Sequence, residues 1–589
     1  MEKQAQKNIV LKGVAASPGI VIGEVFLFDR KIVEAKEQEL KEEEEIGKEL
    51  LRFKKALAET KREMINLRDK VARRIDPDHA KIFDAQIMIL EDQWINQNVV
   101  SKIEETRRNA EYVYKQVIER MIQELSASRD EYIRERILDI NEVGHRLLYN
   151  LLGIKRKTLE TVDRQVILIA RTLAPGDVVQ MRREFILGFA TDTGGGTSHV
   201  ALLAKSLGIP AVVGLRDCFP RVENGMQVVL DGNKGEIILH PDQNTIQRYV
   251  QEKENLLAQS RRLLELKSLP AETLDGRRIE LSANIELPSD VEQALEYGAE
   301  GVGLFRTEYL YLTRSDLPTE EEQYKAYLKV AQKMAPKSAI LRTFDLGGDK
   351  FSKGLGDSYE ANPFLGWRAI RACLDLPDLF KVQLRAMLRA SALGNLKIMF
   401  PMISSLKELL RAKEILEEVK SELRSQDEPF DEKIQVGIMV EIPSAALLAD
   451  SLAKECDFFS IGTNDLIQYT LAVDRGNEKI SYLYQDFHPS VLKLIKEVIE
   501  AGHRNKIWVG LCGEMAGEPK AIPLLVGMGI NELSTSPMAI PQVKNVIRSI
   551  KFKEAKKLVD KVLTLSQTEE IEKVLEDYCS QISLQCQTK

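Results

Sequence analysis

QVGIMVEIPSA, residues 435–445, is a short apolar run that reaches a glutamate, Glu441, and is followed by a helical pattern. Seven other runs after residue 274 share this arrangement. The eight runs are RIELSANIE (278–286), GVGLFRTEYLY (301–311), AILRTFDLGG (339–348), LKIMFPMIS (396–404), QVGIMVEIPSA, DFFSIGTNDL (457–466), KIWVGLCGEMA (506–516) and GINELSTSP (529–537). Helical patterns such as SDVEQALEYGA lie between them. Eight strand–helix units in succession predict a (β/α)₈ barrel.

Polar residues lie near the C-terminal ends of most of these predicted strands. Active sites of such barrels occupy that end, and a barrel with a purely structural role does not need a polar ring there. The ring consists of Asn284, Glu286, Arg306, Glu308, Arg342, Asp345, Glu441, Asn464, Asp465, Cys512 and Glu514. The pattern therefore favours an active site over random loop polarity.

The charges of this ring indicate its ligands. Glu441 and Asp465 follow successive strands and could hold one hard cation. With so few protein oxygens, Mg²⁺ completed by water and substrate fits better than Ca²⁺. Arg306, Arg342 and Arg475 could hold an anion bidentately, although any one of them could instead pair with a neighbouring acid. Together they predict a small, multiply charged anion such as a phosphorylated carboxylate.

A glycine-rich turn precedes a helical pattern in TDTGGGTSHVALLAKSLGIPAVVG, residues 191–214. Its N–H groups can approach an anion, Thr197 or Ser198 can cap the helix, and His199 then lies in the first turn. A phosphoryl group on that ring would meet the positive end of the helix. Without context, a histidine satisfied by hydrogen bonds fits better. Cys512, between two glycines, likewise fits a small buried residue better than an acid or nucleophile.

The rest of the chain predicts further domains. Short strand patterns near the N-terminus give way to apolar residues at helical spacing with charges between them, which indicates a small antiparallel bundle. Strand patterns return at RQVILIA, DVVQM, FILGFAT, AVVGL, QVVLDG and GEIILH, and a long polar helix follows. The predicted boundaries are 1–30 and 158–240 for a β-rich domain, 31–157 for a helical subdomain inserted in it, 241–272 for a linker helix and 273–589 for the barrel.

Composition excludes several classes of protein. The 589 residues exceed what one core usually holds, and the net charge of -7 leaves no basic patch for nucleic acid. The six cysteines are scattered without a CxxC pair, which is typical of a reducing cytosol. The N-terminal sequence lacks the apolar segment of a signal peptide, and no run reaches membrane-spanning length. We therefore expect a cytoplasmic protein without membrane insertion.

The glycine-rich segment resembles the phosphohistidine signature of the PEP-utilising enzymes, where PEP is phosphoenolpyruvate. The segments GLFRTEYLY, LRTFDLGGDK, NPFLGWRAIR, VEIPSA, SIGTNDLIQYTLAVDRGN and GLCGEMAG are similar to those of the enzyme I family of the bacterial PEP:sugar phosphotransferase system. The resemblance covers nearly the whole chain in order. It implies a multidomain α/β fold, in which a swivelling phosphohistidine domain with an inserted helical bundle precedes a (β/α)₈ TIM-type barrel.

The resemblance also implies a reaction. The phosphoryl group of PEP passes to the histidine, releasing pyruvate, and then to a histidine of the carrier protein HPr, in the first step of sugar uptake. HPr is expected on the helical subdomain, and the barrel is expected to form a homodimer. The implied site residues are His199 as phosphoryl carrier, Arg306, Arg342, Arg475, Asn464 and Asp465 at PEP, Glu441 and Asp465 as Mg²⁺ ligands, and Cys512 as proton donor to the enolate carbon.

Three alternatives remain open at this point. Pyruvate phosphate dikinase and PEP synthase share the signature and the barrel, but they need a large ATP-binding domain, and the 198 residues before His199 are occupied by strand patterns and the bundle. A nitrogen-type regulatory paralogue would need an additional N-terminal sensor domain. In a non-catalytic scaffold the phosphorylated state would only signal, and the intact set of histidine, arginines, acids and cysteine argues against that role.

Overall fold

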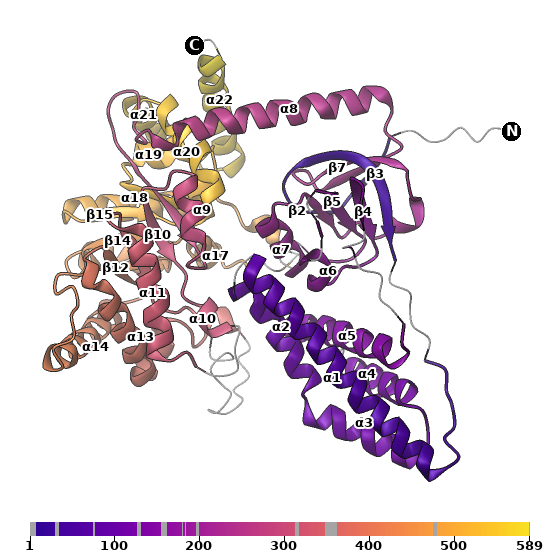
Figure 1. Ribbon diagram of the computed structural model, residues 1–589. Coiled ribbons are helices and arrows are strands. Elements are labelled where there is room, and N and C mark those ends of the chain that lie inside the picture. The colour runs from indigo at the N-terminus through magenta and orange to yellow at the C-terminus, as the bar shows by residue number, and fades with distance from the viewer. Residues whose placement is uncertain are drawn as a thin grey trace. The chain divides into compact units, whose positions relative to one another are not determined.

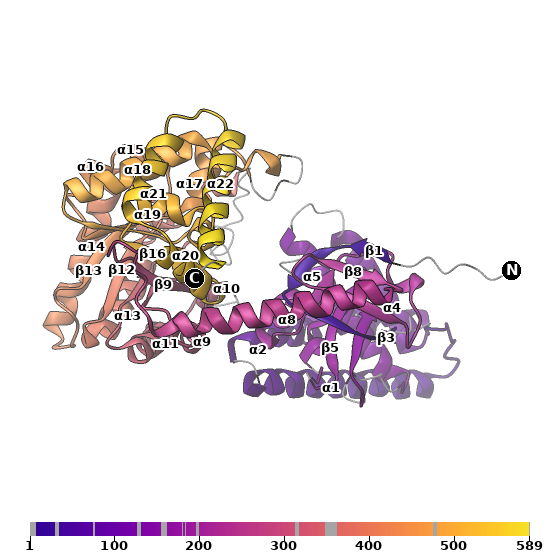
Figure 2. The same ribbon diagram turned by 90° about the horizontal axis from the view of Figure 1, so that it is seen from above.

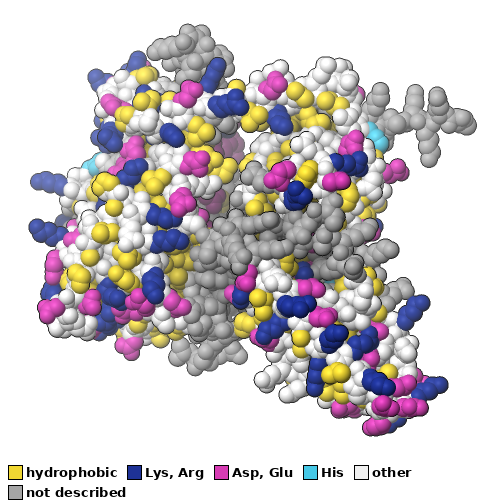
Figure 3. Space-filling model, in the orientation of Figure 1, with side chains coloured by type: hydrophobic (Ala, Val, Ile, Leu, Met, Phe, Trp, Pro, Cys, Tyr) yellow, Lys and Arg dark blue, Asp and Glu magenta, His cyan; other side chains and the backbone are white. Residues whose placement is uncertain are grey.

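The computed structural model divides into two compact units, residues 1–258 and 259–589, which are described separately below (Figure 1). Within these units the structure describes residues 8–587 except 30–34, 75–76, 126–130, 155–158, 160–161, 180, 183, 196–198, 313–316, 348–361, 475–476 and 478–479. None of the helices in these described ranges is long and apolar enough to cross a membrane. Positive and negative side chains are interspersed over the face visible in Figure 3.

A twisted sheet forms the β part of the first unit. Its described strands run in the order β1-β8-β7-β3-β4-β5-β6-β2. β3, β4, β5 and β6 are parallel neighbours, and the other pairings are antiparallel. All five residues of β4 are buried, as expected for a strand covered on both faces. The bounds are β1 Ile9–Lys12, β2 Val14–Ser17, β3 Ile20–Phe28, β4 Val166–Ala170, β5 Ile186–Thr191, β6 Ala211–Val213, β7 Gln227–Asp231 and β8 Glu236–Leu239.

A helical bundle interrupts this sheet between β3 and β4. These two strands are hydrogen-bonded neighbours, with Glu24 opposite Val166, so the chain leaves the sheet and returns beside the point of departure. Phe53, Val99 and Leu147 are fully buried between the helices. The bounds are α1 Glu43–Arg74, α2 Pro77–Leu90, α3 Gln93–Thr106, α4 Ala110–Leu125 and α5 Glu131–Leu151.

One predicted strand of this unit is wrong. DVVQM belongs largely to α6 (Pro175–Val179), a short helix. Pro175 stands at its first position, where a missing N–H costs nothing, and the Asp177 carboxylate accepts a hydrogen bond from the Ala174 N–H at 2.9 Å. These local capping signals outweigh the short apolar run. The remaining helices of the unit are α7 His199–Leu207 and α8 Gln243–Glu265, whose last turns enter the second unit.

The second unit contains a closed barrel of parallel strands, which confirms the predicted (β/α)₈ architecture (Figures 1 and 2). All eight predicted strands are present, and β16 closes the ring by pairing with β9. Glu532 lies opposite Glu280 at this closure. The bounds are β9 Glu280–Ile285, β10 Gly301–Phe305, β11 Ala339–Arg342, β12 Leu396–Phe400, β13 Gln435–Val440, β14 Phe458–Ile461, β15 Trp508–Leu511 and β16 Glu532–Thr535.

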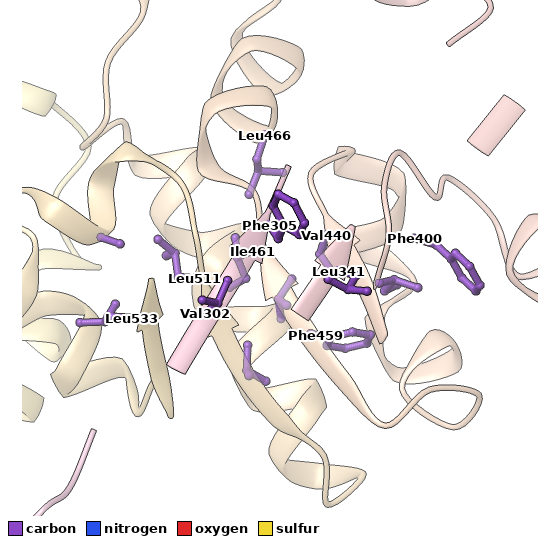
Figure 4. Close-up of a cluster of buried hydrophobic side chains, with 14 of the residues drawn as sticks. Val302, Phe305, Leu341, Phe400, Val440, Phe459, Ile461, Leu466, Leu511 and Leu533 are labelled. Carbon is purple, nitrogen blue, oxygen red and sulfur yellow. The ribbon is translucent and has the colours of Figure 1, made fainter. Parts of the chain in front are cut away.

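Alternate residues of the barrel strands fall into two separate hydrophobic clusters. Leu304, Ile340 and Met439 pack together in a small cluster. Their immediate neighbours, such as Phe305 and Leu341, belong to the large cluster shared with the surrounding helices (Figure 4). Because successive side chains of a strand point to opposite faces, the small cluster fills the interior of the barrel.

Helices surround this barrel and bury its outer side chains. Thr319 and Ser405 each form a capping box at the start of a long helix, α11 and α14. The bounds are α9 Asp290–Glu296, α10 Tyr309–Leu312, α11 Glu320–Met334, α12 Ile370–Asp375, α13 Pro377–Ala390, α14 Leu406–Ser425, α15 Pro443–Leu447, α16 Ala449–Leu452, α17 Thr463–Leu471, α18 Pro489–Arg504, α19 Ile522–Met528, α20 Ile540–Ser549, α21 Phe552–Val562 and α22 Thr568–Gln587.

Two glycine-to-alanine exchanges in helices are expected to change stability in opposite directions. A Cβ at Gly527 in α19 would lie 2.3 Å from the carbonyl oxygen of Ala555 in α21, so Gly527→Ala should destabilise the barrel by about 1–3 kcal/mol despite the better helix propensity of alanine. Gly47 in α1 has no atom within 4 Å of such a Cβ, so Gly47→Ala should stabilise its unit by about 0.5–1 kcal/mol. Differential scanning calorimetry measures both, and an unchanged Tm for Gly527→Ala would contradict the close packing.

Candidate active site

Several of the predicted ring residues continue the inward-facing alternation of the barrel strands. Arg306 is two residues beyond the inward-facing Leu304, Arg342 two beyond Ile340, and Glu441 two beyond Met439. Cys512 belongs to the interior cluster itself. Since the strands are parallel, these side chains all extend from the same, carboxyl end of the barrel.

Buried charges are packed around Arg342. Its guanidinium donates through Nη2 to Glu308 Oε1 at 2.9 Å, and Nη1 lies 3.3 Å from Asp345 Oδ2. Glu308 Oε1 also accepts the backbone N–H of Asp345 at 2.7 Å. The Arg342 side chain is only 9% exposed, so these carboxylates offset the cost of burying its charge. Arg342 is thus fixed in one orientation at the mouth of the barrel.

A second guanidinium extends this cluster. Arg368 binds Asp345 with both ends of its fork, Nε to Oδ1 at 2.9 Å and Nη2 to Oδ2 at 2.8 Å. Its Nη1 lies 3.9 Å from Asp465 Oδ1. Burial opposes the charge of Arg368, but Asp345 and Asp465 outweigh it and raise its pKa. The ring pattern did not identify Arg368, because it precedes helix α12 instead of following a strand; its occurrence in NPFLGWRAIR was the available signal.

Glu441 is a buried carboxylate with one unused oxygen. Its Oε1 accepts the N–H of Met402 at 2.6 Å, whereas Oε2 has no hydrogen-bond partner in the described part of the chain. Burial, together with the neighbouring Asp465 and Asp345, raises the pKa of Glu441 well above its ordinary value. No group of three or more histidine, cysteine, aspartate or glutamate side chains suited to a metal is found among the described residues. Any cation here would rely on few protein oxygens.

Arg306 and Asn464 are more accessible than this cluster. Arg306 Nη1 lies 3.0 Å from Glu286 Oε1, and both side chains are substantially exposed. Asn464 donates to Glu514 Oε1 at 2.8 Å and accepts the Glu514 N–H at 2.9 Å. The pairing of Arg306 with an acid is thus present, but an exposed pair contributes little free energy and a stronger anion can replace it.

Cys512 lies in the barrel interior beneath these charges. Cys512 is 3% exposed, and its Sγ lies 3.8 Å from the carbonyl oxygen of Ile461. Asn284 donates to the Cys512 carbonyl oxygen at 2.9 Å and holds the strand end in place. Burial is the main cause that raises the pKa of the Cys512 thiol to about 11. The sulfur therefore carries a proton at neutral pH.

The glycine-rich loop of the first unit is anchored at its base. Asp192 accepts the N–H of Cys218 at 2.7 Å, and Thr191 Oγ1 donates to the Thr193 carbonyl at 2.7 Å. Gly194 has φ +111, a conformation that side chains disfavour. His199 is the first residue of α7, as the cap signals predicted. Its side chain, residues 196–198 and the predicted anion-binding Arg475 lie outside the described residues.

Comparison with known proteins gives consistent matches along the chain. Models of the PEP-utilising enzymes match residues 12–136 (N-terminal), 162–235 (mobile domain) and 260–552 (PEP-binding domain). The phosphoenolpyruvate-protein phosphotransferase of Bacillus subtilis (strain 168) is 43% identical over 561 residues, 95% of this chain and 98% of that protein. That of Staphylococcus carnosus (strain TM300) is 42% identical over 568 residues, 96% and 99% of the respective chains. An NMR solution structure of Enzyme I (nEIt) is 39% identical and covers 42% of this chain and 99% of its own, with a TM-score of 0.37.

The Cys512 thiol is expected to react slowly with iodoacetamide in the folded protein. An ordinary thiol is about one quarter thiolate at pH 8, whereas a pKa of about 11 leaves roughly a thousandth, so alkylation should be slower by about a hundredfold or more. Peptide mass spectrometry follows the rate at this residue. The same peptide in guanidinium chloride is the control, and equal rates in both conditions would show that burial does not protect the thiol.

Proposed function

This chain belongs to the phosphoenolpyruvate-protein phosphotransferase family, and we propose that it transfers the phosphoryl group of PEP to His199 and then to a histidine of the phosphocarrier HPr. The observation that carries the proposal is the buried cluster of Arg342 and Arg368 with their carboxylates at the carboxyl end of the barrel. Its charges are held rigidly, so the site needs little reorganisation when charge moves in a reaction.

The charge balance of this cluster supports a divalent cation. In its described part, Glu308, Asp345, Glu441 and Asp465 supply four carboxylates against two guanidinium groups. The unused Oε2 of Glu441 and the mutual repulsion of the carboxylates fit a cation held by Glu441 and Asp465. We propose Mg²⁺ in this place, with water and substrate completing its coordination. When bound, it would supply positive charge to the oxygens of PEP.

PEP itself fits the arginines at the rim. Arg306 is free to exchange its exposed partner Glu286 for a phosphate or carboxylate. Arg342 is already fixed by Glu308 and Asp345, and its Nε has no hydrogen-bond partner among the described residues. Asn464 is proposed at the border of PEP, and Arg475 stays a prediction from the resemblance. An arginine pair of this kind favours a dianion over a neutral substrate.

The proposed chemistry assigns one task to each residue. The neutral His199 ring attacks phosphorus, the bond between phosphorus and the enol oxygen breaks, and PEP departs as the enolate of pyruvate. The Cys512 thiol then gives its proton to the enolate carbon, and the thiolate regains a proton from water. A thiol that is protonated at neutral pH suits this donation. Arg306 and Arg342 hold the phosphoryl group and the carboxylate in position throughout.

His199 and the barrel residues belong to different units of the chain. We propose that the first unit moves on the connecting helix α8 to bring His199 to the barrel residues, since motions of this kind gate many enzymes. We further propose that HPr docks on the helical bundle, that the barrel forms a homodimer and that the enzyme works in the cytoplasm. The proposed domain boundaries remain those predicted from the sequence.

Labelled PEP tests the proposed phosphoryl carrier. With Mg²⁺ and without HPr, the wild-type protein should take up acid-labile, base-stable label, and His199→Ala should take up none, because no other side chain is proposed to attack phosphorus. His240→Ala, in the same unit, is the control and should label normally. Label that survives in His199→Ala would move the phosphoryl group to another residue. Labelling only with ATP would favour a dikinase, and binding of PEP without any labelling would favour a scaffold.

Arg306→Ala should separate the two half-reactions. We expect labelling by PEP to slow by about a hundredfold or more, because a preorganised cation at the phosphoryl group is lost. Back-transfer from phosphorylated HPr to His199 does not use the barrel and should stay within about twofold. Arg424→Ala, which removes a surface arginine of α14 paired with Glu432, is the control. Loss of both half-reactions in Arg306→Ala would contradict the division of work between the units.

A further inference from the structure

A pocket of about 540 Å³ opens at the end of the barrel opposite the carboxyl ends of the strands. It is lined by residues that precede β10 and β11 and by the short 3₁₀ turn Leu266–Ser268 that follows α8. All of these residues belong to the second unit. The charged and the larger apolar side chains of this lining are Lys267, Leu269, Arg278, Leu295, Glu300 and Lys337. The pocket is therefore separate from the catalytic ring.

The lining is predominantly positive. Lys267, Arg278 and Lys337 carry positive charges, whereas Glu300 is the one acidic side chain among the described lining residues. Glu300 is already paired with Arg278, at 3.1 Å between Oε2 and Nη2. Within the described residues, neither Lys267 nor Lys337 has a carboxylate within ion-pair distance. Lys337 instead donates to the carbonyl oxygen of Ala299 at 2.7 Å.

Two more cations bind backbone carbonyl groups of residues that line the pocket. Lys544 is 1% exposed, and its ammonium donates to the carbonyl oxygens of Lys267 and Gly298 at 3.0 and 3.3 Å. Arg548 donates to the carbonyl oxygen of Pro270 at 2.8 Å. Carbonyl dipoles satisfy the hydrogen-bonding needs of these groups but leave their net charge uncompensated. The backbone at the pocket is thereby held by cations that repel one another.

Burial lowers the pKa of Lys544, and although Glu300 acts in the opposite direction, Lys337, Arg548 and Arg278 lower it further. An anion in the pocket would relieve this repulsion. Because Lys267 and Lys337 have no carboxylate partner among the described residues, a dianion that binds these two lysines does not have to displace an internal ion pair.

We propose that this pocket binds a small organic phosphate, with the phosphate at Lys267 and Lys337 and an apolar group against Leu269 and Leu295. The volume is much larger than inorganic phosphate requires and falls in the range of small-molecule sites. Leu269 is 40% exposed and offers its side chain for contact. The site lies where α8 joins the barrel, so its ligand would also brace that junction.

Phenyl phosphate is a suitable probe, since it combines a dianion with an apolar ring. Isothermal titration of the full-length protein should detect binding that weakens by at least tenfold in the double variant Lys267→Gln/Lys337→Gln, because two charge-assisted contacts are lost. Both lysines are exposed, so the variant should fold. Lys333→Gln, at a residue of α11 that precedes Lys337 in the sequence and is paired with Glu292, is the matched control and should bind as wild type does.

Three results would overturn the proposal. These are no detectable binding of phenyl phosphate, titration curves of the double variant that superimpose on those of wild type, and inorganic phosphate binding as tightly as phenyl phosphate. Phosphorylation of each variant by labelled PEP reports separately on the catalytic site and should remain within about twofold of wild type. If the wild-type protein itself were not phosphorylated by PEP, that result would contradict the proposed function, but it would not contradict the binding of an organic phosphate in this pocket.

Discussion

The period-two alternation of the barrel strands is the constraint on which the site depends. In a closed parallel barrel, every inward residue at a carboxyl end converges on the same small volume. Arg306, Arg342, Glu441 and Cys512 all share the inward register of Leu304, Ile340 and Met439. A shift of one residue in any strand would turn its functional side chain outward into the helices. Hydrophobic packing of the interior therefore also fixes the chemistry at its mouth.

Charge is the second organising feature of this mouth. Arg342 and Arg368 are each held by carboxylates, and Asp345 contacts both. Breaking one member of such a buried network leaves its partners uncompensated, so the cluster behaves as a unit. The arrangement combines a fixed inner guanidinium with an exposed outer one, Arg306, whose acid partner is easily replaced. Substrate can thus enter without dismantling the buried charges.

Much of this arrangement followed from the sequence, for identifiable reasons. The eight barrel strands were predictable because each is an apolar run followed by a helical pattern. DVVQM was assigned wrongly because the capping signals of Pro175 and Asp177 act over only a few residues. Arg368 could not be found from strand ends, since only the tertiary fold brings it to Asp345. The sequence did not determine the partner of Arg306, because an exposed arginine can pair either with an acidic side chain of the protein or with an anionic group of the substrate. The roles of His199 and Arg475 still rest on the sequence.

The adjacency of β3 and β4 has a consequence for the order of folding. Their pairing closes a loop of about 140 residues, and the entropic cost of closing a flexible loop increases with the length of the loop. The helices within that loop have their own buried core around Phe53 and Leu147. If these local contacts form first, the two strand ends are brought together by a compact body instead of a random chain, and the long-range pairing becomes faster. In that order of events, folding of the bundle assists formation of the sheet into which the bundle is inserted.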